Sequence, residues 1–97
     1  MLLWIVVAAI ASGPGRCGST EIVRIMSANI TSGDHSAYED PGIRIFQALE
    51  PDVVLIQEFN YEGGTLREFV NRAFGSEFSY YVEPGRENIP NGIVSRY

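Results

Sequence analysis

Residues 51–58 read Pro-Asp-Val-Val-Leu-Ile-Gln-Glu, a run of four apolar residues that leads into an amide and a carboxylate. This pattern predicts a buried strand over residues 52–58 that stops on a polar pair. A similar apolar strand is predicted over residues 22–28, and it leads into Asn29. Ligands usually bind at the carboxyl edge of an open α/β sheet, so strands that end in Asn29 and Glu58 indicate a site at that edge.

The segment between these strands predicts a short amphipathic helix over residues 41–50. Asp40 suits the N-cap position and Pro41 the first turn. The strand-helix-strand order predicts a parallel pair with a right-handed crossover. Asn29 and Glu58 would then share one edge of the sheet, about 5 Å apart if their strands are neighbours.

The remainder of the chain continues the alternation of helices and strands. Residues 65–75 predict a second helix with Gly75 as its C-cap, and residues 78–82 predict a strand. Residues 84–92 are rich in turn formers, and residues 93–97 begin a further strand. Both strands of the parallel pair are nearly continuous in apolar residues, as expected when both faces of a sheet are covered. The predicted class is α/β.

The composition limits the possible functions. Ninety-seven residues suffice for one small domain. The net charge of −5 comes from 7 arginines, no lysine and 12 acidic residues, without any basic run. A stand-alone nucleic-acid-binding module, which needs a basic surface, is therefore disfavoured, whereas an enzyme that reaches phosphate through a metal is not. Cys17 is the single cysteine, so neither an internal disulfide nor a cysteine-based zinc site is expected.

The first twelve residues are apolar and can be interpreted in two ways. The run is shorter than the roughly 20 residues of a membrane-spanning helix. Small residues Ala9 and Ala11 suit cleavage of a secretory signal, although no basic segment precedes the run. We expect residues 1–20 to be a signal peptide and linker of a secreted or envelope protein. The alternative is a strand of the domain, in which case the protein would be cytoplasmic.

Glu58 beside Asn29 has the chemistry of half a metal site. Mg²⁺ is typically bound by one or two carboxylates, with waters and substrate phosphates completing its shell. A neighbouring amide can orient a phosphate oxygen or a water. On spacing alone, a Glu at the end of a strand is more often a solvated surface residue or the partner of an arginine than part of a functional site.

Three segments resemble a known family. Ile25-Met26-Ser27-Ala28-Asn29 resembles the first-strand asparagine motif of the endonuclease/exonuclease/phosphatase family, which has the deoxyribonuclease-I-like fold. The Pro51–Glu58 stretch resembles the Gln-Glu motif of that family, and Asn91-Gly92-Ile93-Val94-Ser95-Arg96-Tyr97 is similar to its next core strand. The resemblance covers residues 22–97, although residues 60–90 match in the order of elements more than in residues.

The resemblance implies a fold and an activity. Residues 21–97 would be the N-terminal portion of a deoxyribonuclease-I-like α/β sandwich. The protein would be a metal-dependent phosphoester hydrolase, acting as a phosphodiesterase, nuclease or phosphatase with Mg²⁺ or Mn²⁺. Glu58 would be a metal ligand, and Asn29 would contact the phosphate or the metal and its water. The substrate would be nucleic acid, a phospholipid head group or an inositol phosphate; neither a stable protein partner nor a transmembrane span is implied.

The other motifs of the family are an Asp-x-Asn pair, a further Asp and a terminal Asp-His. We expect them beyond Tyr97, so that the 97-residue chain would be an inactive fragment on its own. Ser32-Gly33-Asp34-His35 only superficially resembles the ending, because it follows the first strand in a polar loop. Arg44 and Arg86 are interpreted as solvated surface charges.

Two rival functions remain open. One is a non-catalytic binding module on the same fold. The other is an unrelated nucleotide-binding protein, which is disfavoured because residues 29–33 hold one glycine where dinucleotide sites need several.

Overall fold

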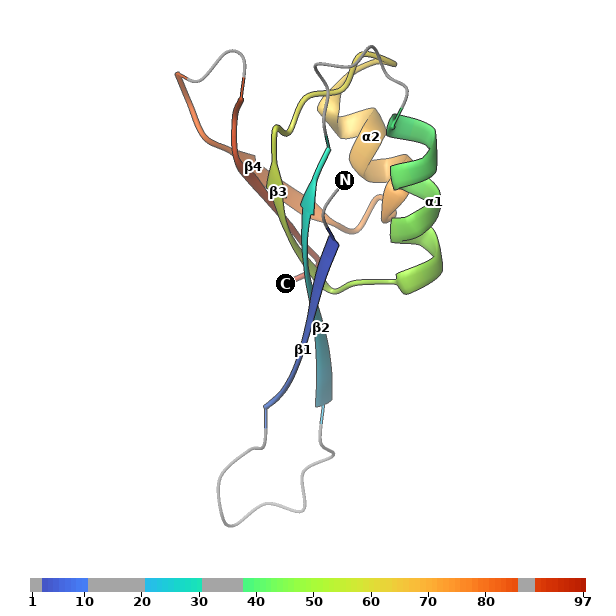
Figure 1. Cartoon of the computed structure of the whole chain (residues 1–97), viewed down its shortest axis with the longest axis vertical. Helices are drawn as coiled ribbons and strands as arrows, with labels where there is room; N and C mark the ends of the chain where they lie inside the picture. Colours follow the sequence, from blue (N-terminus) through green and yellow to red (C-terminus); the bar gives the residue numbers. More distant parts are fainter. Residues whose placement is uncertain (1–2, 11–20, 31–37, 86–88) are drawn as a thin grey trace.

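The protein is a mixed α/β structure in a computed structural model that describes residues 3–10, 21–30, 38–85 and 89–97. These described residues form two helices and five strands (Figure 1). In chain order they are β1 (Leu3–Ile10), β2 (Glu21–Asn29), α1 (Glu39–Leu49), β3 (Val53–Gln57), α2 (Leu66–Ala73), β4 (Ser79–Val82) and β5 (Gly92–Ser95).

The five strands form one sheet in the order β1-β2-β3-β5-β4. β2 and β3 are parallel neighbours, with Ala28 opposite Ile56 and Asn29 opposite Gln57. The predicted parallel pair joined by a helix is therefore confirmed. The other three pairings are antiparallel. The carboxyl ends of β2 and β3 consequently meet at one edge.

The start of α1 differs from the sequence prediction. The helix begins at Glu39, its N-cap is Tyr38, and no side chain caps it, so Asp40 is not the N-cap. Glu39 and Asp40 instead occupy the first turn, where carboxylates interact favourably with the helix dipole. Pro41 also fits in this turn because the first backbone N–H groups of a helix have no partner within it.

The start of α2 follows a capping box that the sequence analysis did not identify. The Thr65 side chain accepts from the Glu68 backbone N–H, and the Glu68 carboxylate accepts from the Thr65 backbone N–H. At the other end the C-cap is Phe74 rather than Gly75. Gly75 comes one residue later with a φ of 119°, a conformation that favours glycine.

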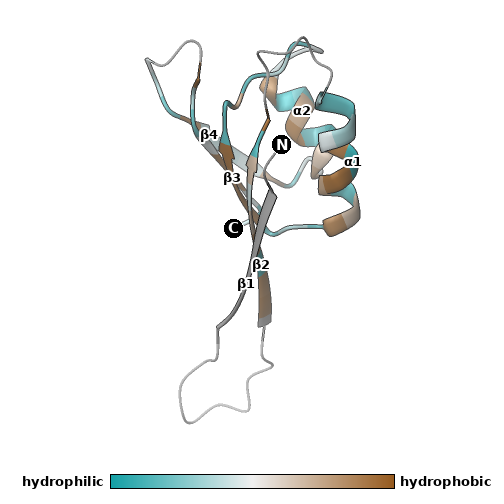
Figure 2. Cartoon of the chain, viewed as in Figure 1, coloured by the Kyte–Doolittle hydropathy of each residue, from teal (hydrophilic) through white to brown (hydrophobic). Residues whose placement is uncertain are grey.

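Both helices lie against the same face of the sheet, and the core fills the space between them (Figure 1). Phe46 of α1 contacts Phe69 of α2 edge to face, with ring centroids 6.2 Å apart. Figure 2 shows hydrophobic and hydrophilic residues on each helix, as expected for helices with one buried side. The remaining core residues with the least exposure are Met26, Ala28, Ile30, Ile43, Val54, Ile56, Phe59, Val70 and Val94.

The opposite face of the sheet is open within the described part of the chain. Leu55 of β3, Ile93 of β5 and Tyr81 of β4 lie side by side in register, and their exposed fractions are 42%, 45% and 63%. The expectation of cover on both faces concerned the parallel pair, and no described residue provides that cover for Leu55 of β3. Continuous apolar strands did not distinguish a face that is buried here from one that is left bare.

The N-terminal apolar run forms β1, which pairs antiparallel with β2 from Leu3 opposite Ala28 to Ile10 opposite Glu21. For residues 3–10 this agrees with the alternative interpretation, a strand of the domain; the other residues of the run lie outside the described residues. Export and cleavage of the segment remain predictions. Neither of the described helices is long and apolar enough to cross a membrane.

Candidate functional site

Asn29 and Glu58 meet at the carboxyl edge of the parallel pair. Asn29 is the last residue of β2, and Glu58 directly follows β3. The Asn29 side-chain amide Nδ2 donates to Glu58 Oε1 across 3.4 Å. Both residues are half-buried. The expected juxtaposition is confirmed, because parallel pairing with Asn29 opposite Gln57 places Glu58 one residue beyond its partner.

The Glu58 backbone has a left-handed conformation, with a φ of 54°. For a residue with a Cβ this conformation costs about 1–2 kcal/mol. The next two residues fix it: the Phe59 N–H donates to the Pro90 carbonyl at 2.7 Å, and the Asn60 N–H donates to the Glu58 carbonyl at 2.8 Å. The Phe59 side chain is fully buried. Strained residues of this kind cluster at functional sites, where the surrounding structure maintains them.

Asn29 Oδ1 is the one buried side-chain polar atom without a hydrogen-bond partner in the described structure. Leaving such an acceptor unsatisfied costs about 1–3 kcal/mol. Most buried polar atoms of native proteins have a partner, so an exception calls for an explanation. A free amide oxygen beside a carboxylate has the donor chemistry that a hard cation or a phosphate-bound water requires.

The two side chains are of the ligand types that Mg²⁺ or Mn²⁺ prefers, but two protein ligands fill only part of the coordination shell of such an ion. Among the described residues, no group of three or more His, Cys, Asp or Glu side chains could hold a metal. Glu58 with Asn29 therefore offers one carboxylate and one amide oxygen. Mg²⁺ commonly keeps several waters and binds through one or two carboxylates plus substrate phosphates. A weak site completed by water and substrate is consistent with this donor set.

Gln57, the other half of the polar pair, does not join the site. Its side chain is exposed, and Nε2 donates to Ser27 Oγ at 3.3 Å. Alternation along β3 directs it to the open face, whereas the left-handed turn redirects Glu58 toward Asn29.

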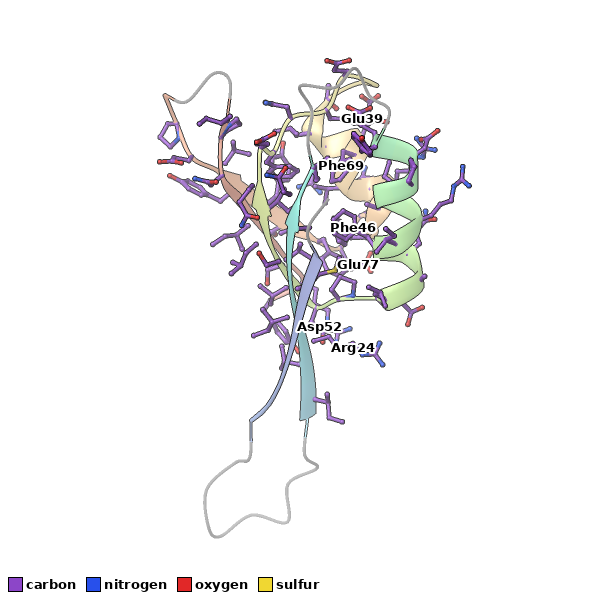
Figure 3. The ribbon with its side chains drawn as sticks, in the orientation of Figure 1. Arg24, Glu39, Phe46, Asp52, Phe69 and Glu77 are labelled. Carbon is purple, nitrogen blue, oxygen red and sulfur yellow. The ribbon has the colours of Figure 1, made fainter. Side chains whose placement is uncertain are left out.

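Asp52 lies at the opposite end of β3, as its place at the strand start predicted (Figure 3). Its side chain is buried and accepts from the Arg24 backbone N–H at 2.6 Å. Arg96 Nη2 lies 2.9 Å from its other oxygen. Asp52 therefore joins β2, β3 and β5 as a structural residue.

Glu39 is a buried acid that the sequence analysis missed. It is 5% exposed, and its Oε1 accepts from the Glu62 backbone N–H at 2.7 Å. Figure 3 places it at the start of α1, at the end of the molecule where β2 and β3 terminate. Because the contact joins residues 23 apart, spacing within a single helix gave no signal for it.

Four residues or segments considered in the sequence lie outside the described residues or away from the site. Cys17, residues 32–35 and Arg86 lie outside the described residues. Arg44 is exposed on α1, in agreement with a solvated surface charge.

No protein-family model matches this sequence, and the search of curated proteins also finds no match. The family resemblance therefore rests on the quoted motifs around Asn29, Glu58 and residues 91–97.

Proposed function

We propose that residues 21–97 supply the Glu58 and Asn29 part of the site of a metal-dependent phosphoester hydrolase with the deoxyribonuclease-I-like fold. The observation that carries the proposal is the pairing of an unpartnered, buried Asn29 Oδ1 with a Glu58 carboxylate held by a strained backbone. Neither feature stabilises the fold by itself. Both are accounted for if the pair binds a cation and a phosphate.

The two residues have different roles in this proposal. Glu58 supplies the negative charge and an oxygen ligand. Asn29 supplies a second oxygen, or orients the phosphate through its amide, and its hydrogen bond to Glu58 keeps the two groups together. A Mg²⁺ ion held by these two residues would polarise the phosphoryl oxygen and stabilise charge on the leaving oxygen. The proposed substrates are nucleic acid, phospholipid head groups or inositol phosphates.

Metal binding tests the site directly. Mn²⁺ titration followed by electron paramagnetic resonance should show one weak site that Mg²⁺ displaces. Glu58→Gln keeps the shape but removes the charge, so binding should be lost. Asn29→Ala should weaken it less. Glu77→Gln is the matched control, because it removes the same charge from an exposed residue of the turn between α2 and β4 and should leave binding unchanged.

Hydrolysis of phosphodiesters and phosphomonoesters by the natural gene product, with and without EDTA, tests the chemistry. Glu58→Gln should abolish turnover. Asn29→Ala should slow it by about 10²–10³-fold, the usual loss when one positioned donor to developing charge is removed. Activity that survives both EDTA and Glu58→Gln contradicts the metal assignment. Metal and phosphoester binding without any turnover would favour the non-catalytic binding module.

A further inference from the structure

Glu39 forms a hydrogen bond with the segment that carries Glu58. The Glu39 side chain is almost completely buried, in the first turn of α1. Its Oε1 accepts a 2.7 Å hydrogen bond from the Glu62 backbone N–H. A charge-assisted bond of this kind is about twice as strong as a neutral one. Glu62 lies in the connection between β3 and α2, four residues after Glu58.

Three described backbone N–H groups of this connection donate hydrogen bonds, and the Tyr61 ring also packs against Phe69. The Phe59 N–H donates to the Pro90 carbonyl before β5, and the Phe59 ring is fully buried. The Asn60 N–H donates to the Glu58 carbonyl within the turn itself. The bond from Glu62 to Glu39 ties the far side of the turn to α1. Among these hydrogen bonds, only the one to Glu39 uses a side chain as acceptor.

The left-handed backbone of Glu58 makes this tether important. A strained conformation persists only while its surroundings over-determine it. If Glu62 is released, the turn can relax, and the Glu58 carboxylate then moves away from Asn29. We propose that Glu39 is a positioning residue, which holds the Glu58–Asn29 pair together through the backbone of Glu62. Its role toward a metal rests on the proposed function, whereas its role in the geometry does not.

The first test requires no metal. The Asn29 side-chain amide resonances, followed by ¹H–¹⁵N NMR on the full chain, report its bond to Glu58. Glu39→Ala should shift them toward their positions in Glu58→Ala, and Glu39→Gln, which retains an acceptor oxygen, should restore them largely. Asp40→Ala is the matched control: it removes the same charge one residue away. Its exposed pair with Arg72, 2.8 Å long, contributes little, so the resonances should not move.

The second test uses Mn²⁺ as the probe. Glu39→Ala should weaken Mn²⁺ binding by about 10- to 100-fold, as is typical when a residue that supports a metal ligand is removed, and Asp40→Ala should not. If wild-type protein binds no Mn²⁺, the proposed function fails, while the Asn29 resonances still decide the positioning role. Unchanged resonances in Glu39→Ala overturn the inference.

If Glu39→Ala does not fold, a substitution of the hydrogen-bond donor, Glu62, tests the same inference. Glu62→Pro removes the N–H that Glu39 accepts and leaves the buried carboxylate in place. It should shift the Asn29 resonances in the same direction. If Glu62→Pro folds with these resonances unmoved, the bond does not position the pair. If both variants unfold, the bond is a determinant of the whole fold. Either outcome makes the positioning role wrong.

Discussion

Glu58 and Glu50 are the two residues other than glycine with positive φ in the described chain, at 54° and 47°. Glu50 closes α1 just before Pro51, where its exposed side chain lies 3.9 Å from Arg24. Its strain is explained by the need to turn the chain from the helix into β3. Glu58 follows a strand, and no such sharp change of element requires its conformation. The two residues therefore form a matched pair at which structural and functional strain can be compared.

Replacing each of these residues by glycine should separate the two cases. Glycine adopts the left-handed conformation freely, but it also gains freedom in the unfolded chain, so each change should alter the free energy of unfolding by about 1 kcal/mol or less. Glu58→Gly should abolish Mn²⁺ binding, whereas Glu50→Gly should retain it. Chemical denaturation and Mn²⁺ titration are the measurements. A loss well above 1 kcal/mol in Glu58→Gly would mean that the carboxylate is a structural residue.

At the scale of elements, each helix and strand is positioned by a few close contacts. Gly92 begins β5, where its backbone lies against the Phe59 ring and the Tyr81 carbonyl. Phe59 directly follows Glu58, so the packing at Gly92 supports the turn that carries the candidate site. Gly42 in α1 has no atom within 4 Å of the place where a Cβ would be.

Alanine substitutions at these two glycines should have opposite effects. Gly92→Ala would press a methyl group into Phe59, so we expect a loss of about 1–3 kcal/mol in the free energy of unfolding. Gly42→Ala fills open space in a helix and should stabilise the protein by about 0.5–1 kcal/mol. Urea denaturation of both variants measures the two changes in the free energy of unfolding. Equal effects of the two substitutions would contradict the close approach at Gly92.

The capping box of α2 makes a pH-dependent contribution. Hydrogen bonds from the Thr65 backbone N–H and hydroxyl lower the pKa of Glu68 from its ordinary value of 4.5. Because the folded pKa lies below the unfolded one, this stabilisation is complete above about pH 4.5 and is lost as the pH falls through the folded value. Wild type should therefore exceed Glu68→Gln in free energy of unfolding at neutral pH, and the two should converge in acid. A difference that is independent of pH would refute the contribution.

At the scale of the whole molecule, the main feature is that the described residues cover one face of the sheet and leave the other face exposed. Both helices pack on one face, and the row formed by Leu55, Ile93 and Tyr81 crosses the other face without cover from described residues. Contiguous apolar surface of this kind marks an interaction site or a tendency to aggregate. The chain in isolation is accordingly expected to be marginally stable and to self-associate.

Reducing the apolar character of this row should suppress self-association. Leu55→Thr with Ile93→Thr retains residues that favour strands while making the face more polar. We expect less binding of the dye ANS and a shift toward monomer in sedimentation experiments. Leu49→Gln, at an exposed apolar position of α1 away from this face, is the control and should change neither. Unchanged sedimentation of the double variant would show that the row does not drive association.

Local sequence determined much of this protein. The apolar runs, the helix between them and Pro51 sufficed to predict the parallel pair, and parallel pairing alone brings Asn29 and Glu58 to one edge. These features depend on periodicity and chain direction, which neighbouring residues fix.

Tertiary structure decided the rest. The left-handed turn at Glu58, its tether to Glu39 and the unpartnered Asn29 Oδ1 depend on contacts between residues more than twenty positions apart. The lack of cover by described residues on one face of the sheet likewise follows from where α1 and α2 pack, because the apolar pattern of a strand is the same whether its second face is covered or open.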